Sequence, residues 1–396
     1  MGRDHSLNAG RGRIAAMPLT RRAFAATALS ASRILGANDR VRVAGLGVGG
    51  RGRALLERVA RIEGTTIAAL ADVYEPRFAS FPQAKSHADY RAALDDKSID
   101  AVVIGSPDHW HVRMTLDAID AGKDVYVEKP LTKTIEEGYR VERAFRESDR
   151  IVQVGYQQRS TDTFLRAKEL VDAGEVGEIT LARTWWYQNY HARRGKLPVI
   201  DASKLDWKAW LGPAPAQPFD ALRYIQWRWF WDFGGGTLTD LFSHWVDSVH
   251  WILGKSRPEL VAVTGRKVLM KEWECPDAVA GSWSYPGFVV SYDSTLASSI
   301  EDGGLVLRGT KGALRVTRSA VALYPEDAAK GGALPPPKFE FRAQTDGTLA
   351  HLQNWIDCVR SRKTPNSDIP SAAASANAAH LGNRSLREES VVKLNA

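Results

Sequence analysis

A chain of 396 residues, with 44% hydrophobic and 25% charged residues, is long enough for two domains and has the composition of a folded globular protein. The net charge of +7 falls to +3 without residues 1–39, which hold six Arg against two Asp, and no basic cluster with interleaved aromatics remains, so no nucleic-acid partner is expected. Cys275 and Cys358 lack metal-ligand spacing and are expected to be buried thiols, with a disulfide left open, and no apolar run reaches the ~18 residues of a membrane span.

The N-terminal segment has the pattern of an export leader. Residues 17–24 read MPLTRRAF, which resembles the twin-arginine export signature, and a small-residue apolar run follows to Leu35. Residues 1–38 are therefore predicted to lie outside the folded domains. We expect a periplasmic or secreted protein, or a cytoplasmic one if the leader does not function. A disordered tail with a chance Arg pair is the alternative, because Arg33 interrupts the apolar run.

A short β-branched strand then runs into a glycine-rich loop. Gly45, Gly47 and Gly50 have the G-x-G-x-x-G spacing, in which one glycine turns off the strand, one admits a pyrophosphate and one lets helix and strand pack closely. The helical pattern at 54–60 would direct its N-terminus at the phosphates. We predict that the loop binds a dinucleotide through Gly45, Gly47, Val48, Gly49, Gly50 and Arg51.

Alternating strand and helix patterns continue to residue 155 and predict that residues 39–155 form an NAD(P)-binding α/β domain with a parallel sheet. A second buried strand ends at Asp72, 22 residues after Gly50. A carboxylate there would bind the adenosine ribose hydroxyls, which favours NAD over NADP. Arg77 follows closely enough to keep NADP open as the cofactor.

Two later strand ends carry polar side chains. The strand 99–105 leads into the loop 106–111, SPDHWH, which should face the cofactor beyond the carboxyl ends of the strands. Its two histidines have no further metal ligands nearby, so we expect cofactor contact or helix capping and no metal site. The strand 124–127 ends in Glu128-Lys129-Pro130, where Lys129 could donate to a substrate hydroxyl; a solvated surface lysine is the alternative.

From Tyr156 the pattern changes and predicts an α+β domain over residues 156–396, with a mainly antiparallel sheet. A helix is expected at 163–173. Strands are expected at 178–187, 259–270, 278–284, 288–297, 305–308 and 313–317. Two final helices, at 351–359 and 371–386, could pack back on the first domain.

A glycine run is followed by three polar residues that are spaced as on one face of a helix. Asp240, His244 and Asp247 follow one another at i, i+4 and i+7, which puts them on one face of an α-helix. Carboxylates beside a histidine fix its tautomer and stabilise its protonated form, which suits a proton acceptor. The alternative is a histidine whose hydrogen bonds are satisfied on a buried helix.

Tryptophan is unevenly distributed, because nine of the 13 lie between residues 185 and 251. Most of these are expected to pack in the core or at an interface. Those on loops beside the predicted helix would also offer flat surfaces to the C–H faces of a sugar ring. The distribution therefore favours a carbohydrate ligand.

Four pieces in order, Gly45–Gly50, Glu128–Pro130, Gly234–Gly236 and the Asp240–His244 pair, resemble the glucose–fructose oxidoreductase/inositol dehydrogenase (Gfo/Idh/MocA) family. The resemblance covers nearly everything from Val41 onward. It implies a Rossmann domain followed by an open, mainly antiparallel sheet domain with helices on one face. It also implies NAD(P)-linked oxidation or reduction of a secondary hydroxyl or ketone in a sugar, sugar derivative or cyclitol, in a homo-oligomer assembled through the sheets.

The resemblance also assigns residues to roles. Lys129 matches the active-site lysine, and Asp240 and His244 match the acid–histidine pair. His244 is then expected to take the hydroxyl proton, with Asp240 orienting it and Lys129 hydrogen-bonding the same oxygen. On the cofactor side, Pro107 and His111 match the loop beneath the nicotinamide ribose, and Glu128 and Pro130 shape the lysine loop. Ser106, Glu128 and Lys129 are also expected to contact the cofactor.

Two other functions stay open. A glycoside hydrolase could use bound NAD transiently, oxidising a hydroxyl, eliminating the aglycone and reducing the sugar again. The second alternative is a non-catalytic sugar- or nucleotide-binding protein. The presence of Lys129, Asp240 and His244 argues against it. The tryptophan-rich segment 185–231 departs from the general family pattern.

Overall fold

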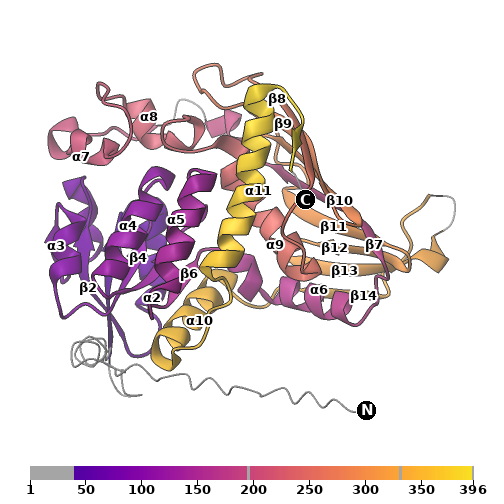
Figure 1. Ribbon diagram of the computed structural model, residues 1–396, viewed down its shortest axis with the longest axis horizontal. Coiled ribbons are helices and arrows are strands. Elements are labelled where there is room, and N and C mark those ends of the chain that lie inside the picture. Colours follow the sequence, from indigo (N-terminus) through magenta and orange to yellow (C-terminus); the bar gives the residue numbers. More distant parts are fainter. Residues whose placement is uncertain (1–39, 194–196, 330–331, 395–396) are drawn as a thin grey trace, which may run out of the picture.

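The computed structural model describes residues 40–193, 197–329 and 332–394, and the predicted leader, residues 1–38, lies outside this part of the chain. Two sheets stand side by side, and the long helix α11 (Ile369–Glu388) runs between them (Figure 1). Cys275 and Cys358 are buried free thiols, as predicted. Within the described residues, no helix combines the length and the apolar character that crossing a membrane requires.

The first sheet has six strands in the order β3-β2-β1-β4-β5-β6, and every neighbouring pair is parallel. The strands are β1 (Val41–Leu46), β2 (Thr65–Ala71), β3 (Lys85–His87), β4 (Ala101–Ile104), β5 (Asp124–Val127) and β6 (Val152–Val154). Every residue of β4, β5 and β6 is buried, as in a parallel sheet covered on both faces. The predicted Rossmann domain is confirmed, and its strand order reverses between β1 and β4, where such sheets bind ligands.

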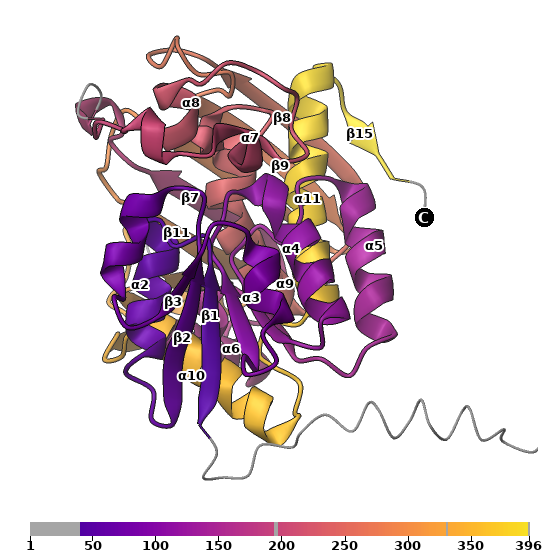
Figure 2. The same cartoon turned by 90° about the vertical axis from the view of Figure 1, so that its left-hand side faces the viewer.

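Helices pack on this sheet from both sides (Figure 2). They are α2 (Gly50–Val59), α3 (Tyr90–Asp95), α4 (Asp108–Asp120), α5 (Ile135–Arg146) and the late helix α10 (Gly347–Ser361). α5 begins with a capping box, in which Thr134 and Glu137 each accept a backbone N–H from the other. α10 returns from the far end of the sequence, and Leu352 and Trp355 enter the core beside α2.

The second sheet has nine strands in the order β14-β13-β12-β11-β7-β10-β9-β8-β15, and only the pair β7–β10 is parallel. Its helices α6 (Asp162–Asp172), α9 (Ser243–Leu253) and α11 contact β13, β7 and β8. The predicted mainly antiparallel domain is confirmed. The strands are β7 (Ile179–Tyr187), β8 (Leu260–Arg266), β9 (Ala278–Tyr285), β10 (Phe288–Thr295), β11 (Gly303–Gly309), β12 (Gly312–Val316), β13 (Ala320–Pro325), β14 (Phe339–Arg342) and β15 (Val392–Lys393).

One predicted strand is too long. β8 ends at Arg266, four residues before the predicted end at Met270. The carboxylate of Asp277 accepts the backbone N–H groups of Val268 and Leu269, both at 2.7 Å, and that of Met270 at 2.6 Å. These bonds satisfy the donors outside the sheet, so the chain turns away from it.

A buried ion pair ties the second domain together near the first. Arg159 donates to both carboxylate oxygens of Asp247, at 2.9 and 2.7 Å, and the two side chains are 6% and 0% exposed. Ser375 on α11 donates to the same carboxylate at 2.9 Å. Removing one partner of such a pair typically costs ~3–5 kcal/mol, because the other charge stays buried. Asp247 is therefore a structural anchor between α9, α11 and the turn before α6.

Candidate functional site

The glycine-rich loop turns at Gly47, directly after β1. Gly47 has a φ of 78°, in the left-handed region that favours glycine. A Cβ on Gly52 would lie 2.0 Å from the Gly47 carbonyl oxygen, whereas a Cβ on Gly50 would meet nothing within 4 Å. The motif in the structure is therefore Gly47-x-Gly49-x-x-Gly52, two residues later than the predicted spacing that begins at Gly45.

The loop lines a cavity of about 580 Å³ through Gly47, Gly49, Gly50 and Arg51. Gly45 lies inside β1 and Val48 packs in the core, and neither belongs to the cavity wall. α2 begins at this loop, so its unpaired backbone N–H groups face the cavity. This is the arrangement that a pyrophosphate group requires.

Asp72 lies beside this loop, directly after β2. Its carboxylate accepts the backbone N–H groups of Val48 at 2.7 Å and Tyr74 at 2.9 Å. Arg77 donates to both oxygens at 3.1 Å. Asp72 and Arg77 both line the first cavity, at the place predicted for a contact with the adenosine ribose.

The tryptophan-rich segment forms the opposite wall of the first cavity, through Trp210, Tyr224, Trp227 and Arg228. It contains α7 (Trp207–Leu211) and α8 (Ala221–Ile225), which lie next to the first domain in Figure 1. The indole of Trp110, on α4, donates to the Trp210 carbonyl at 2.9 Å. A dinucleotide in the cavity would lie between the glycine loop and this segment.

Most of the nine clustered tryptophans pack in the core, as predicted. Five are at most 4% exposed: Trp185, Trp186, Trp210, Trp229 and Trp245. Trp186 and Trp227 also line a second cavity. The concentration of tryptophan therefore serves both the core and the walls of the site.

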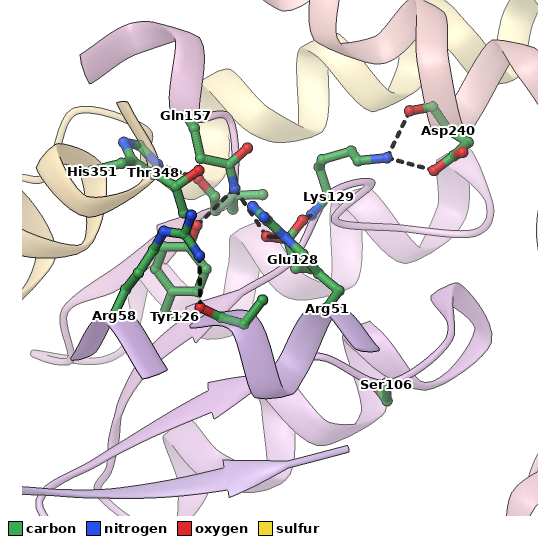
Figure 3. A network of polar contacts seen from close by, with 12 residues as sticks. Arg51, Arg58, Ser106, Tyr126, Glu128, Lys129, Gln157, Asp240, Thr348 and His351 are labelled. Atoms are coloured by element: carbon green, nitrogen blue, oxygen red, sulfur yellow. Dashed lines mark hydrogen bonds and ion pairs between the residues drawn. The ribbon is translucent and has the colours of Figure 1, made fainter. Parts of the chain in front are cut away.

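Lys129 joins the two domains just after β5. Its ammonium donates to the backbone carbonyl and to the carboxylate of Asp240, both at 2.6 Å (Figure 3). Arg228 donates to the same carboxylate at 3.2 Å. Burial by itself would raise the pKa of the Asp240 carboxyl, but the charges of Lys129 and Arg228 outweigh it and hold that pKa below its usual value. Asp240 is therefore ionised.

The turn that carries Asp240 differs from the prediction. Leu238–Phe242 is π-helical and only the following segment, α9, is α-helical, so the predicted single face is broken. Asp240 and His244 still line one cavity, whereas Asp247 points to Arg159. No hydrogen bond joins Asp240 to His244 among the contacts of the described residues. The carboxylate that was expected to orient the histidine binds Lys129 instead.

His244 is a buried, neutral base. Its ring stacks on Trp186, with centroids 5.6 Å apart and planes inclined by 26°. Its Nδ1 is buried without a hydrogen-bond partner in the part of the chain that the structure describes. Burial, and then the charges of Lys129, Arg318 and Arg51, lower the pKa of His244 well below its usual value.

The predicted loop residues hold the site in shape. The carboxylate of Glu128 accepts from Arg51 and from Gln157, each at 2.9 Å (Figure 3). The ring nitrogens of His111 face the carbonyls of Ser106 at 2.9 Å and Pro130 at 2.7 Å. His111 therefore ties the loops after β4 and β5 together.

The other residues of the loop after β4 have separate places. Pro107 caps α4, and both Pro107 and Ser106 line the first cavity. His109 faces the Trp210 carbonyl at 3.1 Å. No group of three or more His, Cys, Asp or Glu side chains suited to a metal ion occurs within residues 40–193, 197–329 and 332–394.

Lys129, Asp240 and His244 line a second cavity of about 570 Å³. It shares Arg51, Ser106 and other wall residues with the first cavity. A ligand in the second cavity would therefore lie next to one bound at the glycine loop.

Sequence reasoning did not single out four charged residues of the second cavity, Asp108, Arg228, Arg318 and Asp346. Asp108 is 4% exposed, and burial raises its pKa to about 8. Its place at the start of α4, in the segment that follows β4, was a usable signal. Arg228 lies in a short 3-10 helix and Arg318 in a hairpin turn, and no motif surrounds either, so no sequence signal marked them.

Alanine substitutions distinguish the observed glycine spacing from the predicted one. Gly52→Ala would press its Cβ against the Gly47 carbonyl, so the free energy of unfolding should fall by ~1–3 kcal/mol and the affinity for NAD should fall with the displaced loop. Gly50→Ala, with free space around it at the start of α2, should retain wild-type stability or gain slightly. Urea unfolding and NAD titration measure both variants. Equal destabilisation would contradict the observed spacing.

Both halves of the chain are similar in sequence to known proteins. Residues 41–156 match the family model "Oxidoreductase family, NAD-binding Rossmann fold", and residues 164–315 match "GFO/IDH/MocA C-terminal domain". scyllo-Inositol 2-dehydrogenase (NAD(+)) of Bacillus subtilis strain 168 is 26% identical over 284 residues, which cover 69% of this chain and 71% of that protein. Several other curated relatives match over less than half of their own length. Levoglucosan dehydrogenase of Pseudarthrobacter phenanthrenivorans, 28% identical, is matched over 43% of this chain and 37% of its own.

Solved structures share the fold. A levoglucosan dehydrogenase in complex with NADH superposes with a TM-score of 0.70 at 19% identity, covering 90% of this chain and 100% of that one. The aldose-aldose oxidoreductase of Caulobacter crescentus gives 0.69 at 19% identity, with the same coverage. Because family models match both domains, the chain belongs to the Gfo/Idh/MocA family of NAD-binding oxidoreductases.

Proposed function

We propose that this protein transfers a hydride between NAD and a secondary hydroxyl or ketone of a sugar, sugar derivative or cyclitol. One observation carries the proposal. A single cavity brings together Lys129, Asp240 and His244 and adjoins the cavity of the glycine loop. The substrate class is supported by the relatives, which are named inositol and levoglucosan dehydrogenases.

The residues of the first cavity fit a dinucleotide. Gly47 and Gly49 carry no side chain, so the backbone and the start of α2 would hold the pyrophosphate. Asp72 would accept hydrogen bonds from the ribose hydroxyls. Its negative charge would repel the 2′-phosphate of NADP, although Arg77 lies beside it. NAD bound there supplies the hydride acceptor of the reaction.

The chain itself handles the proton. His244 is neutral, because burial lowers its pKa, and can accept the hydroxyl proton as the carbon is oxidised. The Lys129 ammonium can hydrogen-bond the same oxygen and stabilise its developing negative charge. Asp240 then positions Lys129, to which it is bonded at 2.6 Å, rather than the histidine.

The proposal is tested by releasing and identifying the nucleotide that co-purifies with the protein, then screening sugars and cyclitols for absorbance at the reduced nicotinamide band. We expect NAD, with reduction by at least one substrate class. Release of aglycone from an aryl glycoside without NADH accumulation would instead indicate redox-neutral hydrolysis. Nucleotide binding without any hydride exchange would indicate a binding protein.

Substitution of His244 tests the proton step. In His244→Ala we expect kcat to fall by ~10²–10⁴-fold, because general acid–base catalysis is worth that much, while NAD binding is unchanged. His250→Ala is the matched control on the same helix. His250 is buried and bonded to Tyr285 and Ser375, and lines neither cavity, so this variant should lose stability but keep its kcat. Wild-type turnover in His244→Ala would remove His244 from the mechanism.

We further propose that the leader directs the protein to the periplasm or outside the cell. The twin-arginine route carries folded proteins, which suits an enzyme that binds its nucleotide before export. Fractionation should find the wild type in the periplasm and a variant with Arg21→Lys and Arg22→Lys in the cytoplasm. Wild-type protein confined to the cytoplasm would contradict the proposal.

A homo-oligomer assembled through the second sheet is the remaining part of the proposal. In β10, buried positions alternate with more exposed ones such as Val289, at 36% exposure, so one sheet face is packed by helices and the other is open. Light scattering of the purified protein should give a multiple of 43.6 kDa. A mass of one chain at micromolar concentration would contradict this arrangement.

A further inference from the structure

Arg318 reaches into the second cavity from the turn between β12 and β13. Its guanidinium carbon lies 4.3 Å from the centroid of the Trp186 ring, and Trp186 stacks in turn on His244. Arg318 lines the second cavity and not the first. An anion that meets this guanidinium would therefore belong to the substrate and not to the nucleotide.

The charge of Arg318 is not neutralised by an ion pair. Among the described residues, no carboxylate lies within ion-pair distance of its guanidinium. The other cations of the cavity are already engaged, since Arg51 pairs with Glu128, while Lys129 and Arg228 share Asp240. Arg318 is therefore the cation of this cavity that has no carboxylate partner among the described residues.

Arg318 is nevertheless a cation at neutral pH. Burial lowers the pKa of its guanidinium to about 10, against the raising effect of Asp302 and Asp240, and that value lies far above 7. The side chain of Arg318 remains exposed at the cavity wall, so an anion can reach it without displacing a carboxylate of the described residues.

The geometry also suits a planar anion. A guanidinium that stacks on an indole keeps its N–H groups in its own plane, directed away from the ring face. A carboxylate can accept two of these N–H groups at once, which gives short, charge-assisted hydrogen bonds. The same stack ends on His244, so the anion and the reacting hydroxyl would belong to one small molecule.

We propose that the substrate is an acidic sugar or cyclitol, whose carboxylate binds Arg318 while its reacting hydroxyl faces Lys129 and His244. This inference rests on the proposed function and specifies its substrate class. One guanidinium carries a single positive charge, which a carboxylate matches and a phosphate dianion exceeds. Arg318 is thus a specificity-determining residue.

Binding to the NADH-loaded, full-length protein tests this by calorimetry with matched methyl glycosides. Each uronic acid of gluco, galacto and manno configuration is compared with its neutral hexose and with the hexose 6-phosphate. In one configuration the uronic acid should bind ~10–100-fold more tightly than the neutral sugar, as expected for hydrogen bonds to a charged group. The preference should vanish in Arg318→Met, whose side chain can still pack on Trp186.

Arg315→Met is the matched control. Arg315 lies in β12, stacks on Trp185 and faces neither cavity, so this variant should keep the preference for the acid. Equal binding of acid and neutral sugar, tighter binding of the 6-phosphate, or equal weakening of all ligands in Arg318→Met would overturn the proposal.

Turnover separates this inference from the proposed function. If neutral sugars reduce NAD as efficiently as acids, the acidic substrate class is wrong and the dehydrogenase activity stands. If a uronic acid binds through Arg318 but no hydride reaches NAD, the binding site stands and the dehydrogenase activity is wrong.

Discussion

The contact between Lys129 and Asp240 is the constraint on which the site depends. Lys129 follows a strand of the first domain and Asp240 belongs to the π-helical turn of the second, so their 2.6 Å ion pair fixes the domains to each other where the cavities meet. Arg228 adds the tryptophan-rich segment to the same carboxylate. A buried carboxylate requires such cationic partners. The contacts of Asp240 with Lys129 and Arg228 therefore both hold the site in shape and balance its charge.

Local pattern was sufficient for most strands of the first domain. The strands before Gly47, Asp72 and Lys129 were predicted because short β-branched runs alternate with helical ones. β3, β13, β14 and β15 were missed. The glycine spacing was misplaced by two residues because several glycines fit the motif, and only contact with β4 and its loop selects Gly47 and Gly52.

For the site, the sequence identified Lys129, Asp240 and His244, which the fold gathers around one cavity. It could not predict how they are connected. The π-helical turn changes the helix register, and the spacing of Asp240 and His244 does not reveal it. Arg318 was missed for a similar reason, because a residue in a short turn enters the site only when the second sheet has formed.

α10 and α11 are the last helices of the described chain, and both domains need them to complete their cores. α11 contributes Ile369 and Ala372 to the core of the first domain, and Ala378 and Leu381 to the core of the second. On the ribosome, roughly 200 residues separate β6 from these helices, which is ~10–40 s of synthesis. During this time the nucleotide-binding half exposes the apolar surface that α10 and α11 later cover. Chaperones are therefore expected to bind the growing chain until these helices emerge.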